Sequence, residues 1–269
     1  MTSARRLLPG FGLSLGYSVF YLSCIVLLPF AALLAEGAGT TFRHAWHTVA
    51  DARVLHACGL SLGASLAAAL CNGLFGFVTA WTLARYDFPG RRLADALVDL
   101  PFALPTAVAG IALTTLYAPH GPLGAPLARL GVHVAFTPLG VALALVFVGL
   151  PFVVRALQPV IAALPEDVEE AAACLGADRG QTFRRVVFPA LRPALLTGMT
   201  LAFGRALGEY GSIVFISANL PFRTEILPLL IVGKLEQYDY SGAAVLGLLM
   251  LFFSAAILTG VHFLQRRRA

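Results

Sequence analysis

The stretch Glu170-Ala171-Ala172-Ala173-Cys174-Leu175-Gly176, followed by Val186-Val187-Phe188-Pro189, lies in the most polar part of a very apolar chain. Four acidic residues between 166 and 170 place negative charge where it favours the start of a helix, and Pro165 suits the first helical position. Alanine favours helix and keeps one face slim, and glycine can end a helix in the left-handed conformation. We therefore expect a short helix that ends near Gly176.

A second helix is expected directly after the first. Asp178 and Gln181 have the spacing of a capping box, in which each side chain bonds the backbone of the other. Arg184 and Arg185 follow in the body of this helix, and Pro189 is expected to stop it before the next apolar segment. The product is a slim, alanine-faced hairpin over residues 165–189, a shape suited to docking into a groove of another protein.

Composition places the whole chain in a membrane. Of 269 residues, 58% are hydrophobic and only 12% are charged, and the mean hydropathy is +0.82. These values exclude an ordinary soluble core and predict an all-α bundle of transmembrane helices. The net charge of +5 does not indicate nucleic acid, because the basic residues flank apolar segments. The four cysteines form no close pair, so neither a disulfide framework nor a metal site is expected.

Six apolar segments have the length that a membrane crossing requires, about 20 residues. The first is too long for the apolar part of a typical signal peptide, so we interpret it as a transmembrane helix. An even number of spans places both termini on the same side. The predicted spans are 13–34, 57–84, 97–118, 136–157, 191–218 and 241–264.

The basic residues predict which side is which, because cytoplasmic segments carry the excess of lysine and arginine. Thirteen lie on the side of the hairpin and of both termini, and five lie on the other, so we expect these parts in the cytoplasm. The thirteen are Arg5, Arg6, Arg85, Arg91, Arg92, Arg155, Arg179, Arg184, Arg185, Arg192, Arg266, Arg267 and Arg268; the five are Arg43, Arg53, Arg129, Arg223 and Lys234.

The third span carries two prolines one turn apart, Pro101 and Pro105, followed by Thr106. They free backbone carbonyls and bend the helix, and a membrane tolerates this only where protein or a wet cavity covers it. The span is a candidate wall of a translocation pathway. The alternative is an ordinary proline-kinked packing helix.

Arg205 and Glu209 are charged residues inside the fifth predicted span, four positions apart on one helical face. Each would cost about 2.5–3.5 kcal/mol at the bilayer centre, so they are expected to pair. A structural ion pair is one interpretation. The other places Arg205 in a passage, where it briefly attracts an anion while Glu209 keeps the binding weak.

Two segments are predicted to lie on the external side of the membrane. Residues 119–135 are rich in proline and glycine and read as a turn-rich external loop. The stretch from Glu225 to Leu235 is too short to span, and we expect an external interfacial or gating helix there.

Other classes of protein fit poorly. Gly12–Gly16 and Gly59–Gly63 match the G-x-S-x-G pattern of serine hydrolases. In those enzymes the serine lies on a turn between a strand and a helix, whereas both serines here lie at the start of apolar helices. An ion-coupled carrier would need a chain of intramembrane carboxylates or histidines, which the sequence lacks. No P-loop occurs, so energy from ATP would have to come from a separate subunit.

The hairpin pattern resembles the loop of ATP-binding-cassette (ABC) importer permeases that docks on the ATPase. Phe188 stands where that family usually has leucine. Further blocks, Leu8–Gly16, Arg85–Arg91, Asp99–Gly110, Pro151–Arg155 and Leu207–Gly211, look like the permeases of sulfate/thiosulfate importers, specifically their T subunit. The residues that match the docking pattern are Glu170, Ala171, Ala172, Gly176, Val186 and Pro189.

The resemblance implies a non-enzymatic subunit with a type I importer permease fold in the bacterial inner membrane. It implies a first helix and periplasmic loop over residues 1–56 and a permease domain over 57–265. The implied partners are an ATPase dimer that binds Mg-ATP, a homologous permease of the W type that completes a heterodimer, and a periplasmic sulfate/thiosulfate-binding protein. No cofactor of its own is implied. A molybdate or tungstate permease is the alternative.

Overall fold

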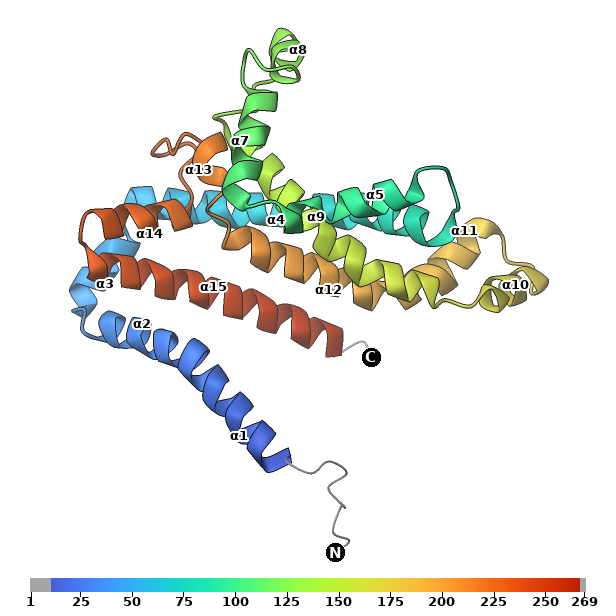
Figure 1. Ribbon diagram of the computed structural model, residues 1–269, viewed down its shortest axis with the longest axis horizontal. Helices are drawn as coiled ribbons and strands as arrows, with labels where there is room; N and C mark the ends of the chain where they lie inside the picture. Colours follow the sequence, from blue (N-terminus) through green and yellow to red (C-terminus); the bar gives the residue numbers. More distant parts are fainter. Residues whose placement is uncertain (1–10, 267–269) are drawn as a thin grey trace, which may run out of the picture. The chain divides into compact units, whose positions relative to one another are not determined.

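The computed structural model describes residues 11–266, and every regular element in that range is helical (Figure 1). The expected all-α class is therefore confirmed. The contacts group into two compact units, residues up to 50 with 231–251 and residues 51–230 with those from 252 onward, which are described separately. Arg5, Arg6, Arg267, Arg268 and the start of the Leu8–Gly16 block lie outside the described residues.

Among the residues that the structure describes, five helical stretches are long and apolar enough to cross a membrane. They correspond to five of the six predicted spans, with ends that differ by several residues. In the remaining predicted span, 97–118, the longest helix is the shorter apolar helix Thr106–Tyr117. The five stretches are Phe11–Ala38, Ala52–Arg85, Pro138–Ala162, Arg179–Leu207 and Tyr240–Val261.

In the first unit, one continuous helix is made of α1 (Phe11–Leu22), the π-helical turn η1 (Ser23–Leu27) and α2 (Leu28–Ala38). None of its residues is buried within the chain, which suits a helix whose apolar side chains face lipid. The short helix α3 (Phe42–Val49) follows inside the predicted periplasmic loop. Leu248 of α15 (Tyr240–Arg266) packs against the open face of Gly37.

The second unit has a core of three long helices, α4 (Ala52–Arg85), α9 (Pro138–Ala162) and α12 (Phe188–Leu207). Glycines let these helices approach closely, because small residues at an interface bring backbones together in a membrane. Met199 fills the space beside Gly73, and Val153 lies against both Gly76 and Gly198. The buried side chains that these helices share include Ala80, Leu83, Val153, Val154, Leu157, Ile161, Leu191 and Ala202.

The expectation that Pro189 stops the second hairpin helix is wrong. The helices α11 (Arg179–Thr182), η2 (Phe183–Val187) and α12 form one continuous stretch. Proline lacks a donor, and its ring strikes the carbonyl four residues earlier in an α-helix. Here a π turn covers that position: the N–H of Phe188 donates to the carbonyl of Phe183. The wider turn displaces the carbonyl, so the helix continues through the proline.

The same device occurs at η1, where the N–H of Leu28 donates to the carbonyl of Ser23 just before Pro29. Each π turn ends two residues before a proline. The fifth predicted span, 191–218, is therefore displaced: its helix begins at Arg179 and ends at Leu207.

The third predicted span is broken instead of bent. The end of α5 (Arg91–Val98), α6 (Leu100–Ala103) and α7 (Thr106–Tyr117) occupy it. Leu104, which precedes Pro105, is extended with ψ of 134°. Steric contact with a following proline ring disfavours helical geometry, so the helix stops there.

The remaining elements are short. The expected turn-rich loop 119–135 contains one small helix, α8 (Gly124–Arg129). The helix α13 (Ile213–Ile216) follows the end of α12, and α14 (Leu227–Glu236) occupies the segment where an external helix was expected. The first four residues of α14 are buried, so this end does not lie free at a membrane interface.

Candidate docking hairpin and translocation-pathway residues

The hairpin begins with α10 (Glu166–Cys174). Pro165 lies one residue earlier than expected, as the N-cap with extended backbone. Gly176 ends the helix with φ of +83°, as its sequence position predicted. The N–H of Ala177 donates to the carbonyl of Ala172 at 3.0 Å, and the N–H of Gly176 donates to that of Ala173 at 2.9 Å. This pair of bonds is the Schellman motif, which satisfies the last free carbonyls of α10.

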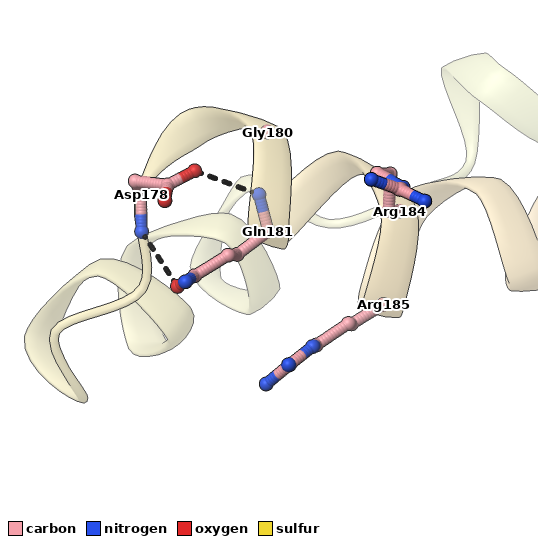
Figure 2. Close-up of a pocket in the computed structure, with 5 residues that line it drawn as sticks. All are labelled: Asp178, Gly180, Gln181, Arg184 and Arg185. Atoms are coloured by element: carbon pink, nitrogen blue, oxygen red, sulfur yellow. Dashed lines mark hydrogen bonds between the residues drawn. The ribbon is translucent and has the colours of Figure 1, made fainter.

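The second helix starts with the predicted capping box. The N–H of Gln181 donates to Oδ1 of Asp178 at 2.8 Å, and the N–H of Asp178 donates to Oε1 of Gln181 at 3.2 Å. Figure 2 shows these two bonds, with Arg184 and Arg185 of η2 lining the same pocket. Both arginines are exposed, so this side of the hairpin offers guanidinium donors to acidic groups of a partner.

The predicted docking residues fall in two places. Glu170, Ala171 and Gly176 are exposed at the free part of the hairpin, with Ala172 half-buried beside them. Val186, half-buried, and Pro189, exposed, lie instead on the helix that leads into α12. The structure thus gathers four of the six residues on one projecting element.

Leu175 is a feature of this element that sequence reasoning missed. It is the C-cap of α10 and its side chain is 89% exposed. An exposed leucine next to the left-handed Gly176 forms an apolar knob on a polar hairpin. The signal was present in the sequence, since an apolar residue at the end of a short polar helix has no core to enter.

The Arg205–Glu209 pair forms as expected, with Nη1 of Arg205 2.6 Å from Oε2 of Glu209. The helix has already ended at Leu207, however, so Glu209 lies in the turn before α13 and not within a span. Its other oxygen, Oε1, accepts bonds from the N–H and the hydroxyl of Ser212, both at 2.9 Å. Glu209 is only 1% exposed and both of its oxygens are paired, whereas 35% of the Arg205 side chain is accessible.

The two predicted pathway segments meet at this turn. A side chain at Gly211 would lie 2.1 Å from the hydroxyl of Thr106, and one at Gly110 would lie 2.4 Å from the carbonyl of Ser212. The start of α7 therefore packs directly on the turn that carries Glu209. Pro105 is exposed at the N-cap of α7, whereas Pro101 belongs to α6 on the other side of the break. Whether these residues line a passage remains a prediction.

A second charged cluster, which sequence reasoning did not identify, centres on Arg155 of α9. Its Nε and Nη2 donate to the two oxygens of Asp99 at 2.8 and 2.6 Å, and its Nη1 donates to Asp95 at 2.7 Å. The cluster ties α5 and the cap of α6 to α9. Sequence spacing could not show it, because 56 residues separate Arg155 from Asp99.

The electrostatics of this cluster are visible at Asp95, on the short helix α5. Hydrogen bonding from the Arg155 guanidinium lowers the pKa of the Asp95 carboxyl below its ordinary value, against a smaller opposing effect of burial. The amide of Gln158 also donates to Asp95. The carboxylate is therefore held in its charged form.

Another ion pair lies at the N-terminal end of α4. Nε and Nη2 of Arg53 donate to the two oxygens of Glu225, both at 2.6 Å, and Glu225 is only 2% exposed. Two residues on, the N–H of Leu227 donates to the hydroxyl of Ser61 at 2.8 Å. Ser61 is thus a buried acceptor within α4, which leaves no nucleophile elbow at Gly59–Gly63.

Among the described residues 11–266, no three His, Cys, Asp or Glu side chains are placed to hold a metal ion. These sites can bind a partner protein and pair charges. The hairpin presents charged and apolar contact groups, and the buried pairs fix turns and helix ends.

Comparison with known proteins agrees with this architecture. A family model described as "Binding-protein-dependent transport system inner membrane component" matches residues 72–269. A probable sulfate transport system permease protein of Chlorokybus atmophyticus is 47% identical over 245 residues, 91% of this chain and 86% of the relative. The sulfate transport system permease protein CysT of Salmonella typhimurium is 45% identical over 265 residues, 98% and 96% of the two chains.

A solved structure shows the same fold. It is a bacterial alginate ABC transporter in complex with an alginate pentasaccharide-bound periplasmic protein. One of its chains matches with a TM-score of 0.77 and 17% identity, and the match covers 95% of this chain and 93% of that one.

Proposed function

Because this chain belongs to the family of binding-protein-dependent transport system inner membrane components, we propose that it is the permease subunit of an ATP-driven sulfate importer. Relatives that are 45–47% identical over most of both chains are named sulfate transport permeases. The molybdate or tungstate alternative is not favoured by these relatives. Thiosulfate, an anion of similar charge, belongs to the same proposal.

The hairpin supports the proposal that a separate ATPase drives transport. It exposes Glu170, Ala171 and Leu175, and its second helix runs without interruption into the apolar helix α12. An ATPase bound to the hairpin would therefore act on a helix that continues without a break into a membrane span. The chain has no P-loop of its own, so a separate ATPase dimer would bind Mg-ATP.

The other proposed partners follow from the family. A periplasmic binding protein would deliver the anion, and a homologous permease of the W type would complete the passage as a heterodimer. The alginate transporter with its bound periplasmic protein supports this type of assembly. Residues 57–265 would form the permease domain, with the hairpin and both termini on the cytoplasmic side of the bacterial inner membrane.

The mechanism rests on linkage. ATP can change the passage only if it binds the assembly differently in its two states, so closure of the ATPase would shift the spans from one state to the other. Sulfate is a strongly hydrated dianion, and its release needs weak binding. Arg205 suits this role: part of its side chain is accessible, and the buried Glu209 offsets its charge.

Uptake of radiolabelled sulfate and of molybdate, in cells that lack this chain and in complemented cells, tests the substrate. We expect complementation to restore sulfate uptake, and excess unlabelled thiosulfate to compete with it. Equal sulfate uptake with and without the chain would refute the proposal. Restoration of molybdate uptake alone would assign the alternative substrate.

A further inference from the structure

Arg85, the last residue of α4, reaches across to the hairpin. Its Nη2 donates to Oε1 of Glu169 on α10 at 2.6 Å, which joins residues 84 positions apart. Its guanidinium also lies 5.4 Å from the ring centre of Trp81, one turn earlier. Only 16% of the Arg85 side chain is exposed, against 37% for Glu169. A guanidinium held over an indole and sheltered from water keeps its direction.

An aromatic cluster holds the second hairpin helix against the same end of α4. The ring of Phe183, in η2, lies edge-on to Trp81 and Phe77, with centroids 6.2 and 6.0 Å away. Edge-to-face pairs at this separation are favourable beyond the area that they bury. The C-terminal end of α4 therefore contacts both helices of the hairpin, one through charge and the other through aromatic packing.

A groove lies where the hairpin meets the end of α4. It has a volume of about 310 Å³, and its lining includes Trp81, Glu169, Ala173, Ala177, Thr182 and Val187. The alanine side chains that line this groove are small, so packing across the groove does not by itself fix how α10 lies against α4. Within its own hairpin, α10 is joined to α11 by the turn that contains Gly176, where the backbone is left-handed.

A force applied to α10 thus has two routes into the membrane. One passes through the turn and α11 into α12, and any bending of the turn would absorb part of it. The other passes directly through Arg85 and Glu169 into α4. Because α4, α9 and α12 are packed through glycine contacts, a displacement of α4 moves the three-helix core together.

We infer that Arg85 and Glu169 are positioning residues for energy coupling: their ion pair makes α10 move with α4, so that force on the hairpin reaches the translocation core. This inference rests on the proposed docking of an ATPase on the hairpin. Arg85 and Glu169 need not touch the ATPase, since Glu169 points toward α4 while the neighbouring Glu170 is exposed.

The test is sulfate uptake per ATP hydrolysed, measured with the whole importer reconstituted in liposomes together with its binding protein. The variants are Glu169→Gln, Arg85→Gln, Arg85→Lys and the charge swap Arg85→Glu with Glu169→Arg. The matched control is Asp87→Asn, which removes the exposed Arg91–Asp87 ion pair two residues beyond α4. Co-purification of the ATPase and the thermal unfolding midpoint are measured for each variant.

We expect Glu169→Gln and Arg85→Gln to lower uptake per ATP by roughly two- to fivefold, the range in which one partly exposed ion pair shifts an equilibrium. Co-purification of the ATPase should stay at the wild-type level. Arg85→Lys keeps the charge and should keep most of the coupling, and the charge swap should recover more than either single variant. The control Asp87→Asn should match wild type.

Unchanged uptake per ATP in both single variants would overturn the inference, and so would a charge swap no better than the singles. Loss of ATPase co-purification would also overturn it, because the pair would then shape the docking surface itself. If the wild-type assembly shows no ATP-dependent sulfate uptake, the proposed function fails as well. That outcome is distinct, since it appears before any variant is compared.

Discussion

Leu175 is the residue at which the docking proposal can be tested most directly. Its side chain is 89% exposed and packs on no core of this chain, so replacement should not disturb folding. We expect Leu175→Asp to reduce ATPase co-purification by about tenfold, which corresponds to the loss of about 1.4 kcal/mol of contact free energy. Pull-down from detergent-solubilised membranes measures this.

Leu130 provides the matched control for this substitution. It is 79% exposed and follows α8, in the loop predicted to lie outside the cell. Leu130→Asp should leave ATPase co-purification unchanged. Equal effects of the two substitutions would mean that exposed leucines matter only for solubility, and Leu175 would not be a docking residue.

At the scale of elements, the cluster around Arg155 predicts a pH-dependent stability. The pKa of Asp95 is lowered in the folded protein, so its contribution is fully present above the unfolded pKa of about 3.9 and is lost as the pH falls through the folded value. Asp95→Asn should therefore lower the unfolding midpoint at pH 7 and have no effect at low pH. The expected size is within about 1 kcal/mol, because the pair is partly exposed.

Thermal unfolding in detergent at a series of pH values measures this difference. Arg155 keeps its two bonds to Asp99 in the variant, so no buried charge is left without a partner. A difference between wild type and Asp95→Asn that does not shrink as the pH falls below about 3.9 would contradict the assignment, because a carboxyl with a lowered folded pKa loses its contribution to stability over that range.

The helices also show where local patterns predict well and where they fail. The hairpin caps at Gly176 and Asp178 followed from spacing alone, because each involves groups within five residues of each other. The continuation through Pro189 did not, since a π turn changes what a proline does. The break at Leu104 was expected only as a bend, because the sequence shows that a proline disturbs a helix but not how far.

At the scale of the whole molecule, the Arg53–Glu225 pair links segments 172 residues apart and predicts an asymmetry. Arg53→Met would leave the Glu225 carboxylate, only 2% exposed, without its partner, and should lower the free energy of unfolding by about 3 kcal/mol. Glu225→Gln leaves the Arg53 guanidinium without its partner, but Arg53 is 43% exposed and can be hydrated, so the loss should be about 1 kcal/mol. Unfolding midpoints should show the first variant to be less stable. The double variant should recover part of the loss, and equal effects would contradict this account.

Orientation in the membrane can be tested through Cys174, which is exposed on the hairpin. In the absence of the ATPase, a membrane-impermeant maleimide should label it in inside-out vesicles and not in right-side-out vesicles. Cys174→Ser removes the labelled thiol and is the control, since Cys58 is buried and Cys24 lies in an apolar helix. Labelling from outside would place the hairpin in the periplasm and refute the docking proposal.

The sequence by itself determined the membrane class, the all-helical fold and the capped hairpin, because hydropathy and caps depend on composition and on neighbours along the chain. Only the tertiary structure decided which charges meet: Arg85 with Glu169, Arg155 with Asp99, and Arg53 with Glu225. It also brought Thr106 onto the turn that carries Glu209. These contacts join distant segments, and their geometry depends on how closely packed helices approach, which no local pattern encodes.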